Sequence, residues 1–198
     1  RCVNSVAVSD DGKIIASASD DKTVKLWSTN GKLLHTLSGH KDVANSVAFS
    51  SDSKIIASAS DDKTIKLWST NGKLLHTLSG NKDAINQVVF SINGKTITSV
   101  SENKTVKIWN IETGELGRKL PNEQNLFKKV SFSPDNKIIV QSTDSGEVRL
   151  WNASTGKLLR TLEVDVSSYF FSNLVFSQDS KIFASEGIDG FKVWDART

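Results

Sequence analysis

All five tryptophans of the chain lie at one position of an internal repeat. They are Trp27, Trp68, Trp109, Trp151 and Trp194, and the intervals between them are 41, 41, 42 and 43 residues. The segment that ends at Trp27, SASDDKTVKLW, returns as SASDDKTIKLW and SVSENKTVKIW before the next two tryptophans. Self-similarity with a period of about 40–45 residues indicates one structural unit repeated along the chain. The repeat therefore constrains the fold, because every unit must adopt nearly the same structure.

Each unit contains short segments with the pattern of β-strands. Apolar and polar side chains alternate along residues 23–27, and Asn30-Gly31 follows as a hairpin turn signal. In the first repeat we expect strands near residues 3–8, 13–19, 23–27 and 32–37. Residues 45–81 differ from residues 4–40 at only five of 37 positions, so we expect the second unit to share the geometry of the first. Four short antiparallel strands per unit are typical of a propeller blade.

The chain resembles the WD40 repeat family, and the resemblance covers nearly all of it. Its near-identical copies are similar to those of repetitive bacterial, notably cyanobacterial, WD40 proteins, although the WD dipeptide itself survives only as Trp194-Asp195. The resemblance implies an all-β fold, a β-propeller made of four-stranded antiparallel WD40 blades. We expect a single propeller segment over residues 1–198, in which the fifth repeat lacks its outer strand. The five repeats lie at about 1–40, 41–81, 82–122, 123–163 and 164–198.

The resemblance also implies how the ring closes. The family most often builds seven blades, and the last blade usually takes its outermost strand from the N-terminal end of the chain. Here the first repeat begins at an innermost strand, and the fifth ends after three strands. We therefore expect a C-terminus close to the native end and a cut N-terminus, within a larger ring of about seven blades. Missing N-terminal blades or oligomerisation would complete that ring, because an open array leaves an uncovered blade with unpaired strand edges at each end.

A structural tetrad inside each blade is a further implication of the resemblance. It links a His, a Ser or Thr, an Asp and the repeat Trp, and the complete set occurs once, as His40, Ser58, Asp62 and Trp68. We expect Asp62 to accept a proton from one imidazole nitrogen. We expect Ser58 to bond the other nitrogen, or the edge of the imidazole ring, and to donate onward to the indole of Trp68. Partial sets in the first and third repeats are Ser17, Asp21, Trp27, Ser99, Asn103 and Trp109.

The tetrad decays along the chain. In the third repeat Asn81 and Asn103 replace the His and the Asp. The fourth repeat holds Glu123, Gln141 and Ser145 at the corresponding positions, and we interpret the pattern as lost there. We expect the later blades to be less rigid, since a buried polar chain stabilises a fold only when every member is paired.

A Ser, a His and an Asp in one blade also fit a catalytic interpretation, that of a propeller hydrolase. The structural interpretation is favoured because Ser and Asp recur in repeats that lack the His. The adjacent acids at 20–21 and 61–62 resemble metal ligands only superficially, and we expect them to be tetrad and turn residues. The sequence therefore predicts no enzyme, no cofactor and no metal site.

Composition narrows the partners and the location. The net charge of +3 is too small for a non-specific nucleic-acid surface, so we expect no nucleic-acid partner. No apolar run is long enough to span a bilayer, and we expect no membrane association. The single cysteine cannot form an intramolecular disulfide, which suits an intracellular protein. We expect a cytoplasmic location.

The remaining candidates for function lie on the surface. Propellers of this family mostly bind partners at the rim where the outer strands exit and the second turns emerge. The candidate partner-binding rim comprises Lys41, Asp42, Lys63, Lys82, Asp83, Glu102, Lys104 and Asp144. We therefore predict a non-catalytic protein-interaction scaffold with a protein partner of unknown identity. The alternative is the C-terminal sensor or recognition region of a larger bacterial signalling or defence protein.

Overall fold

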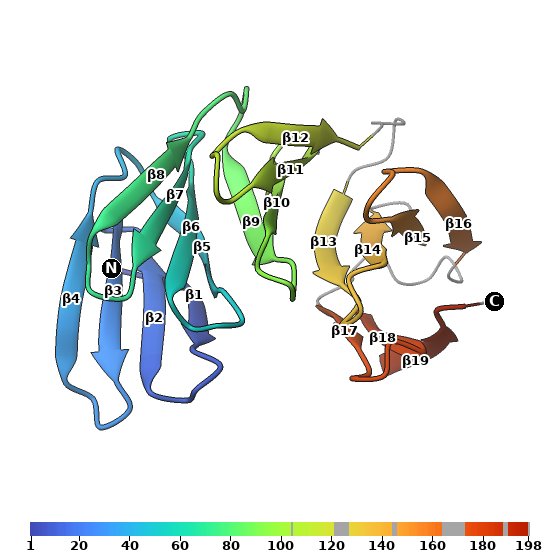
Figure 1. Cartoon of the computed structure of the whole chain (residues 1–198), viewed down its shortest axis with the longest axis horizontal. Coiled ribbons are helices and arrows are strands. Elements are labelled where there is room, and N and C mark those ends of the chain that lie inside the picture. The colour runs from blue at the N-terminus through green and yellow to red at the C-terminus, as the bar shows by residue number, and fades with distance from the viewer. Residues whose placement is uncertain (104, 121–126, 144–145, 164–172, 188–189, 198) are drawn as a thin grey trace.

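The fold consists of β-strands throughout the part of the chain that the structure describes. The computed structural model describes residues 1–103, 105–120, 127–143, 146–163, 173–187 and 190–197. Within these ranges the strands form five separate antiparallel sheets, and no helix is long and apolar enough to cross a bilayer. The predicted all-β propeller architecture is confirmed (Figure 1).

Each sheet is one blade, and its strands follow one another in chain order from the inner strand outward. The first blade comprises β1 (Val3–Val8), β2 (Ile14–Ser19), β3 (Thr23–Ser28) and β4 (Leu33–Ser38). The second comprises β5 (Ala44–Phe49), β6 (Ile55–Ser60), β7 (Ile65–Ser69) and β8 (Leu74–Leu78). The third comprises β9 (Ile85–Phe90), β10 (Thr96–Ser101), β11 (Val106–Asn110) and β12 (Leu116–Lys119). The fourth comprises β13 (Phe127–Phe132), β14 (Ile138–Thr143), β15 (Glu147–Asn152) and β16 (Leu158–Glu163), and the fifth β17 (Asn173–Phe176), β18 (Ile182–Gly187) and β19 (Gly190–Asp195).

One turn recurs between the first two strands of all five blades. In the first blade the Ser9 hydroxyl donates to Asp11 Oδ1 at 2.7 Å and accepts from the Ile14 amide at 2.9 Å. The same serine-to-Asx bond joins Ser50 to Asp52, Ser91 to Asn93, Ser133 to Asp135 and Ser177 to Asp179. The residue after the Asx side chain adopts positive φ in every copy, at Gly12, Ser53, Gly94, Asn136 and Ser180. Side-chain hydrogen bonds of this kind fix the turn locally, so divergent repeats keep the same hairpin.

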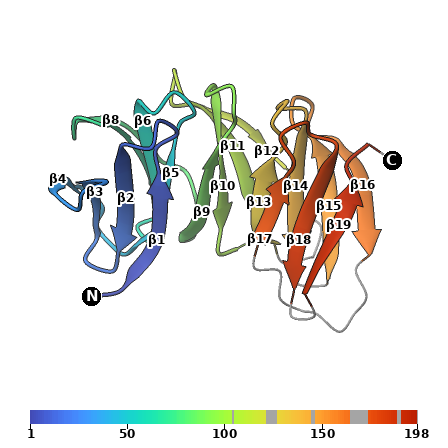
Figure 2. The same cartoon turned by 90° about the horizontal axis from the view of Figure 1, so that it is seen from below.

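The core lies between the blades. Figure 2 shows the sheets side by side, and each neighbouring pair encloses its own apolar cluster. The repeat Trp faces backward along the chain: Trp68 of the second blade packs with Val24 and Leu26 of the first. Trp27 belongs to none of the four clusters that the described residues form and is only half-buried, whereas Trp68 is 2% exposed. Blade-to-blade burial therefore supplies the main stabilisation, as expected for a repeat array.

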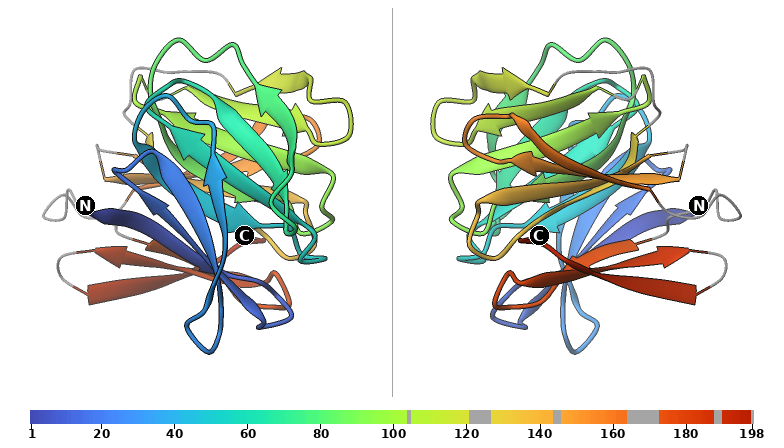
Figure 3. Two further views of the ribbon diagram at one scale, coloured as in Figure 1. Left: turned by 90° about the vertical axis from the view of Figure 1, so that its left-hand side faces the viewer. Right: turned by 90° about the vertical axis from the view of Figure 1, so that its right-hand side faces the viewer.

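The inner strands of successive blades contact one another, and side chains bridge them. The Asn4 amide donates to the Ala44 carbonyl at 3.1 Å, and Asn45 repeats this bond to Ile85. Between the third and fourth blades, Gln87 exchanges two hydrogen bonds with the backbone of Val130. The array stays open between the first and fifth blades (Figure 1). In the left view of Figure 3 the first blade faces the viewer with no sheet in front of it.

Candidate functional site

The second blade contains one continuous polar network. His40 follows β4, Ser58 lies on β6, Asp62 lies in the turn after β6, and Trp68 lies on β7. His40 Nδ1 lies 2.8 Å from Asp62 Oδ2, and His40 Nε2 lies 2.7 Å from Ser58 Oγ. Trp68 Nε1 donates to the same Ser58 Oγ at 2.9 Å. The structure therefore places the four predicted tetrad residues within hydrogen-bond distance of one another.

The direction of the last bond differs from our expectation. The indole nitrogen of Trp68 carries a proton and cannot accept, so it donates to Ser58 Oγ. Our prediction that Ser58 donates to the indole is wrong. Ser58 instead donates its own proton to His40 Nε2, which leaves the Nδ1 proton of His40 for Asp62. The hydroxyl of Ser58 thus serves as both donor and acceptor within the network.

Burial and hydrogen bonding set the charges of this network. Burial raises the pKa of Asp62, but hydrogen bonds from Thr64, the Lys41 amide and His40 outweigh it and lower that pKa to about 2. Burial lowers the pKa of His40, and the adjacent Asp62 opposes this only in part. At neutral pH the pair is therefore an ionised carboxylate and a neutral imidazole. The two side chains are 1% and 6% exposed, so no bulk water screens them.

The network is closed to substrates. Ser58 is 0% exposed, and its oxygen already bonds the imidazole and the indole. A nucleophilic serine must reach a substrate carbonyl while its histidine accepts the proton. Nothing can approach Ser58 Oγ in this arrangement without opening the blade. The geometry therefore supports a structural role for this Ser, His and Asp.

The hydrogen bond between the repeat Trp and the second strand recurs in every blade. In the four blades other than the second, the indole N–H donates to a side-chain oxygen of the second strand at 2.7–3.0 Å. The pairs are Trp27 with Ser17, Trp109 with Ser99, Trp151 with Gln141 and Trp194 with Ser185. In the fourth blade the side-chain oxygen of Gln141 replaces the serine, so our interpretation that the pattern is lost there does not hold for this pair. Glu123 and Ser145 lie outside the described residues.

The acidic turn residues are occupied by hydrogen bonds. Asp21 accepts from the hydroxyl and amide of Thr23 and pairs with Lys25 at 3.0 Å, and these bonds lower its pKa to about 2. Asp20 accepts from Asn4, and Asp61 accepts from an equivalent asparagine in the second blade. In the described part of the chain, no group of three or more His, Cys, Asp or Glu side chains could hold a metal ion.

The structure gathers the described rim residues at two blade junctions. At the first junction, the Lys41 amide donates to Asp62, and Asp42 lies 3.4 Å from Lys22 in an ion pair. Lys22 was not among the predicted rim residues, because its partner lies across a blade boundary. Lys63 is exposed in the adjoining turn and adopts positive φ.

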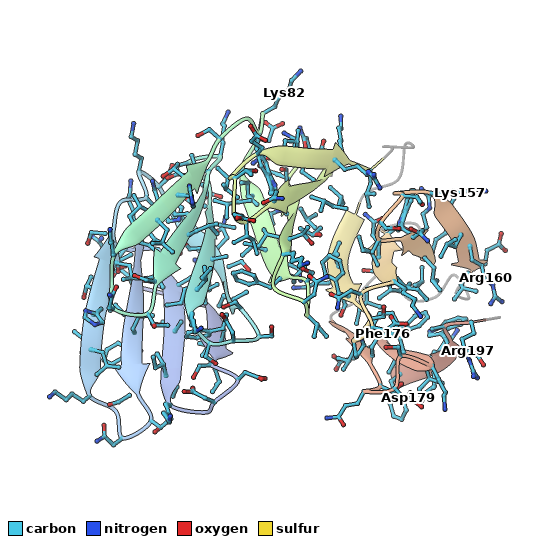
Figure 4. The ribbon with its side chains drawn as sticks, in the orientation of Figure 1. Lys82, Lys157, Arg160, Phe176, Asp179 and Arg197 are labelled. Carbon is cyan, nitrogen blue, oxygen red and sulfur yellow. The ribbon has the colours of Figure 1, made fainter. Side chains whose placement is uncertain are left out.

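The second junction joins the loop before β9 to the turn after β10. The Glu102 amide donates to the Ala84 carbonyl at 2.7 Å, which places Glu102 beside the loop that carries Lys82 and Asp83. Figure 4 shows Lys82 projecting outward from this loop. Lys104 and Asp144 lie outside the described residues.

In the third blade, Asn81 and Asn103 replace the His and the Asp of the tetrad. Asn103 Oδ1 accepts from the Thr105 amide at 3.2 Å, and Asn81 Oδ1 accepts from Ser101 at 3.4 Å. No hydrogen bond joins Asn81 to Asn103 among the described residues. A cavity of about 540 Å³ lies here, and Lys107 and Lys119 line it. Neither lysine was predicted as a site residue. An alignment of the fourth strands could have found Lys119, because the first, second and fourth repeats have a threonine at this position.

Five four-stranded or three-stranded antiparallel blades with a repeated Trp–Ser or Trp–Gln bond define a WD40-type β-propeller. A family model described as the IFT122 first beta-propeller matches residues 2–198, and the chain belongs to this family. A comparison with curated proteins gave no match. A propeller domain of this type suggests a protein-interaction scaffold in general, and such scaffolds are usually non-catalytic.

Proposed function

We propose that the chain is a non-catalytic protein-interaction scaffold whose two end blades each bind a further propeller blade. The observation that carries the proposal is the exposure of apolar side chains on both end faces. Val6 of β1 is 60% exposed, whereas the corresponding Val47 of β5 is 5% exposed. Phe191 of β19 is 76% exposed, whereas the corresponding Ile65 of β7 is fully buried. Exposed apolar patches of this kind mark protein-binding surfaces.

The two end faces are the two halves of one blade-to-blade interface. Inside the array, Leu26 of the first blade shares an apolar cluster with Val47 and Trp68 of the second blade. Equivalent side chains form the clusters at the later junctions. The fifth blade presents the leading half with Phe191 and Val193, and the first blade presents the following half with its valines and Trp27. Such complementary surfaces bind head to tail. Further blades, from the same polypeptide or from a second copy, are therefore the matching occupant.

The loop rim supplies the surface for other partners. Its two described junctions carry exposed side chains of both charges, among them Lys41, Asp42 and Lys82. Charged rims of this kind contribute to partner choice and association rate more than to affinity. The buried tetrad underneath holds these loops in place, since Asp62 bonds the Lys41 amide directly.

Light scattering coupled to size exclusion tests the scaffold proposal with the purified chain. The expected result is a mass that rises above 21.6 kDa as the protein concentration is raised. A Val6→Lys variant should remain monomeric, because association would bury the lysine charge on the first end face. Its thermal stability should stay near that of the wild type, because Val6 is exposed in the single chain. A wild-type chain that remains at 21.6 kDa at every concentration would contradict the proposal.

A further inference from the structure

The cavity of the third blade concentrates positive charge without an acidic counterpart. It has a volume of about 540 Å³, within the roughly 300–1,000 Å³ range of small-ligand sites. Its lining includes the three lysines Lys82, Lys107 and Lys119 together with Asn81 and Asn103. None of the described residues that line it is acidic.

In three other blades, the cation at the position of Lys107 has a side-chain partner. The third-strand cation of the first blade, Lys25, pairs with Asp21 at 3.0 Å. In the fourth blade the corresponding Arg149 pairs with Glu147 at 2.9 Å. In the second blade Lys66 donates to Thr77 across the strand at 3.0 Å. Each of these cations therefore has a carboxylate or a hydroxyl as its partner.

Three substitutions within the repeat remove this balance in the third blade. Asn103 stands where Asp21 and Asp62 stand, so the turn carboxylate is gone. Lys119 stands opposite Lys107 in the strand register, where the first, second and fourth blades have a threonine. The third change, Asn81 for His40, leaves a buried amide nitrogen without a hydrogen-bond partner.

Lys107 is the central charge of this cavity. The residue is 8% exposed, and its ammonium donates to the Gly80 carbonyl at 2.6 Å and lies 5.6 Å from the Trp109 ring centroid. Burial lowers the pKa of Lys107, and the charges of Lys119 and Lys82 lower it further. A buried ammonium that faces two like charges is stabilised by an anion that enters the cavity.

We propose that the cavity between β8, β10, β11 and β12 binds a side-chain carboxylate of an acidic peptide partner. Lys107 and Lys119 would hold the oxyanion through charge-assisted hydrogen bonds. The unpaired Asn81 amide would donate to it, and Lys82 at the outer edge would attract it from solvent. The inference rests on the proposed scaffold function, for which it names the partner chemistry.

Nuclear magnetic resonance of the uniformly labelled chain tests the inference. The Asn81 side-chain amide is followed while hexaglutamate is added, and separately while inorganic phosphate or hexaglutamine is added. The expected result is a saturable shift with hexaglutamate and none with hexaglutamine. A shift with phosphate alone would show a small-anion site and contradict the peptide source, and no saturable shift with either anion would overturn the proposal.

Two variants test the charge of the cavity, and each introduces a residue that other blades have at the same position. Lys119→Thr restores the residue of the first, second and fourth blades, and Asn103→Asp restores the acid of the first and second. Each should weaken hexaglutamate binding at least tenfold, roughly the loss of one charge-assisted contact. Lys73→Thr removes the same charge from an exposed turn of the second blade and serves as the control.

Equal affinity in Lys119→Thr and Lys73→Thr would overturn the assignment of the cavity. Circular dichroism of Lys119→Thr and Lys73→Thr would check that both variants keep the fold of the wild-type chain. The outcome is separable from the scaffold proposal, because Lys119→Thr leaves both end faces intact. Concentration-dependent association should therefore persist in a variant that no longer binds hexaglutamate.

Discussion

Removing the Asp62 carboxylate should destabilise the chain more than removing any equivalent carboxylate. Asp62 accepts from His40 Nδ1 at 2.8 Å, the Lys41 amide at 2.9 Å, the Thr64 amide at 2.9 Å and the Thr64 hydroxyl at 2.6 Å. An Asp62→Ala variant leaves the buried imidazole N–H without an acceptor. A buried unsatisfied donor costs about 1–3 kcal/mol, and each lost bond to a charged group about 1.5–3 kcal/mol.

These losses overlap, and we expect a total of about 3 kcal/mol. For a chain of this size, 1 kcal/mol shifts the melting temperature by about 2–4 °C. Asp62→Ala should therefore lower it by about 6–12 °C in a calorimetric scan at pH 7.

Asp21 is the matched control, because it occupies the same turn position in the first blade. Its bonds to Thr23 and Lys25 are similar, but no buried histidine depends on it, and its side chain is 21% exposed. Asp21→Ala should cost about 1 kcal/mol, since water replaces the lost acceptor. Equal shifts in the two variants, or a shift below about 2 °C in Asp62→Ala, would refute the role given to the His40–Asp62 pair.

Three further predictions follow from the same contacts. Trp68→Ala should lower the free energy of unfolding by about 3–5 kcal/mol, and Trp27→Ala should lower it clearly less, because the neighbouring blade buries only Trp68. Equal losses for the two variants in urea unfolding would contradict the burial argument. Acidification from pH 7 to 5 should lower the free energy of unfolding, because the lowered pKa of His40 makes the folded chain bind a proton there less readily than the unfolded chain does. Below pH 4 the lowered pKa of Asp62 adds a loss of the same sign. His40→Asn, which copies the third blade, should flatten the upper part of that profile, and an unchanged profile would show that His40 does not cause it. Hydrolysis of a generic ester should proceed at the same background rate with wild type and Ser58→Ala; a loss of turnover in a folded variant would establish a catalytic serine.

Most of the fold could be predicted from the sequence, because its signals are local and repeated. The tryptophan spacing and the Ser-x-Asx turns each act within one blade, so five copies reinforce the same interpretation. The turn at Ser177 survives in the fifth repeat, although the rest of that repeat has diverged. The repeat boundaries, the cytoplasmic location and the rigidity of the later blades stay predictions.

The site was predictable only where one blade contains all of its parts. The tetrad residues of the second blade could be named from the sequence, but the donor direction at Ser58 depends on the chemistry of the indole N–H. The third-blade cavity was missed because Lys107 and Lys119 meet through strand register. The Lys22–Asp42 pair was missed because it spans two blades. Single-residue reading cannot reveal such contacts, whereas a comparison of aligned repeats shows the substitutions that create them.

The complementarity of the two end faces is tested most directly by mixing two variants that are each blocked at one end. Val6→Lys disables the first-blade face, and Val193→Lys disables the fifth-blade face. Each variant alone should be a monomer in light scattering. An equimolar mixture should form a one-to-one dimer of twice 21.6 kDa, because each partner supplies the intact half that the other lacks. A mixture that remains monomeric, while the wild-type chain associates, would contradict head-to-tail blade packing.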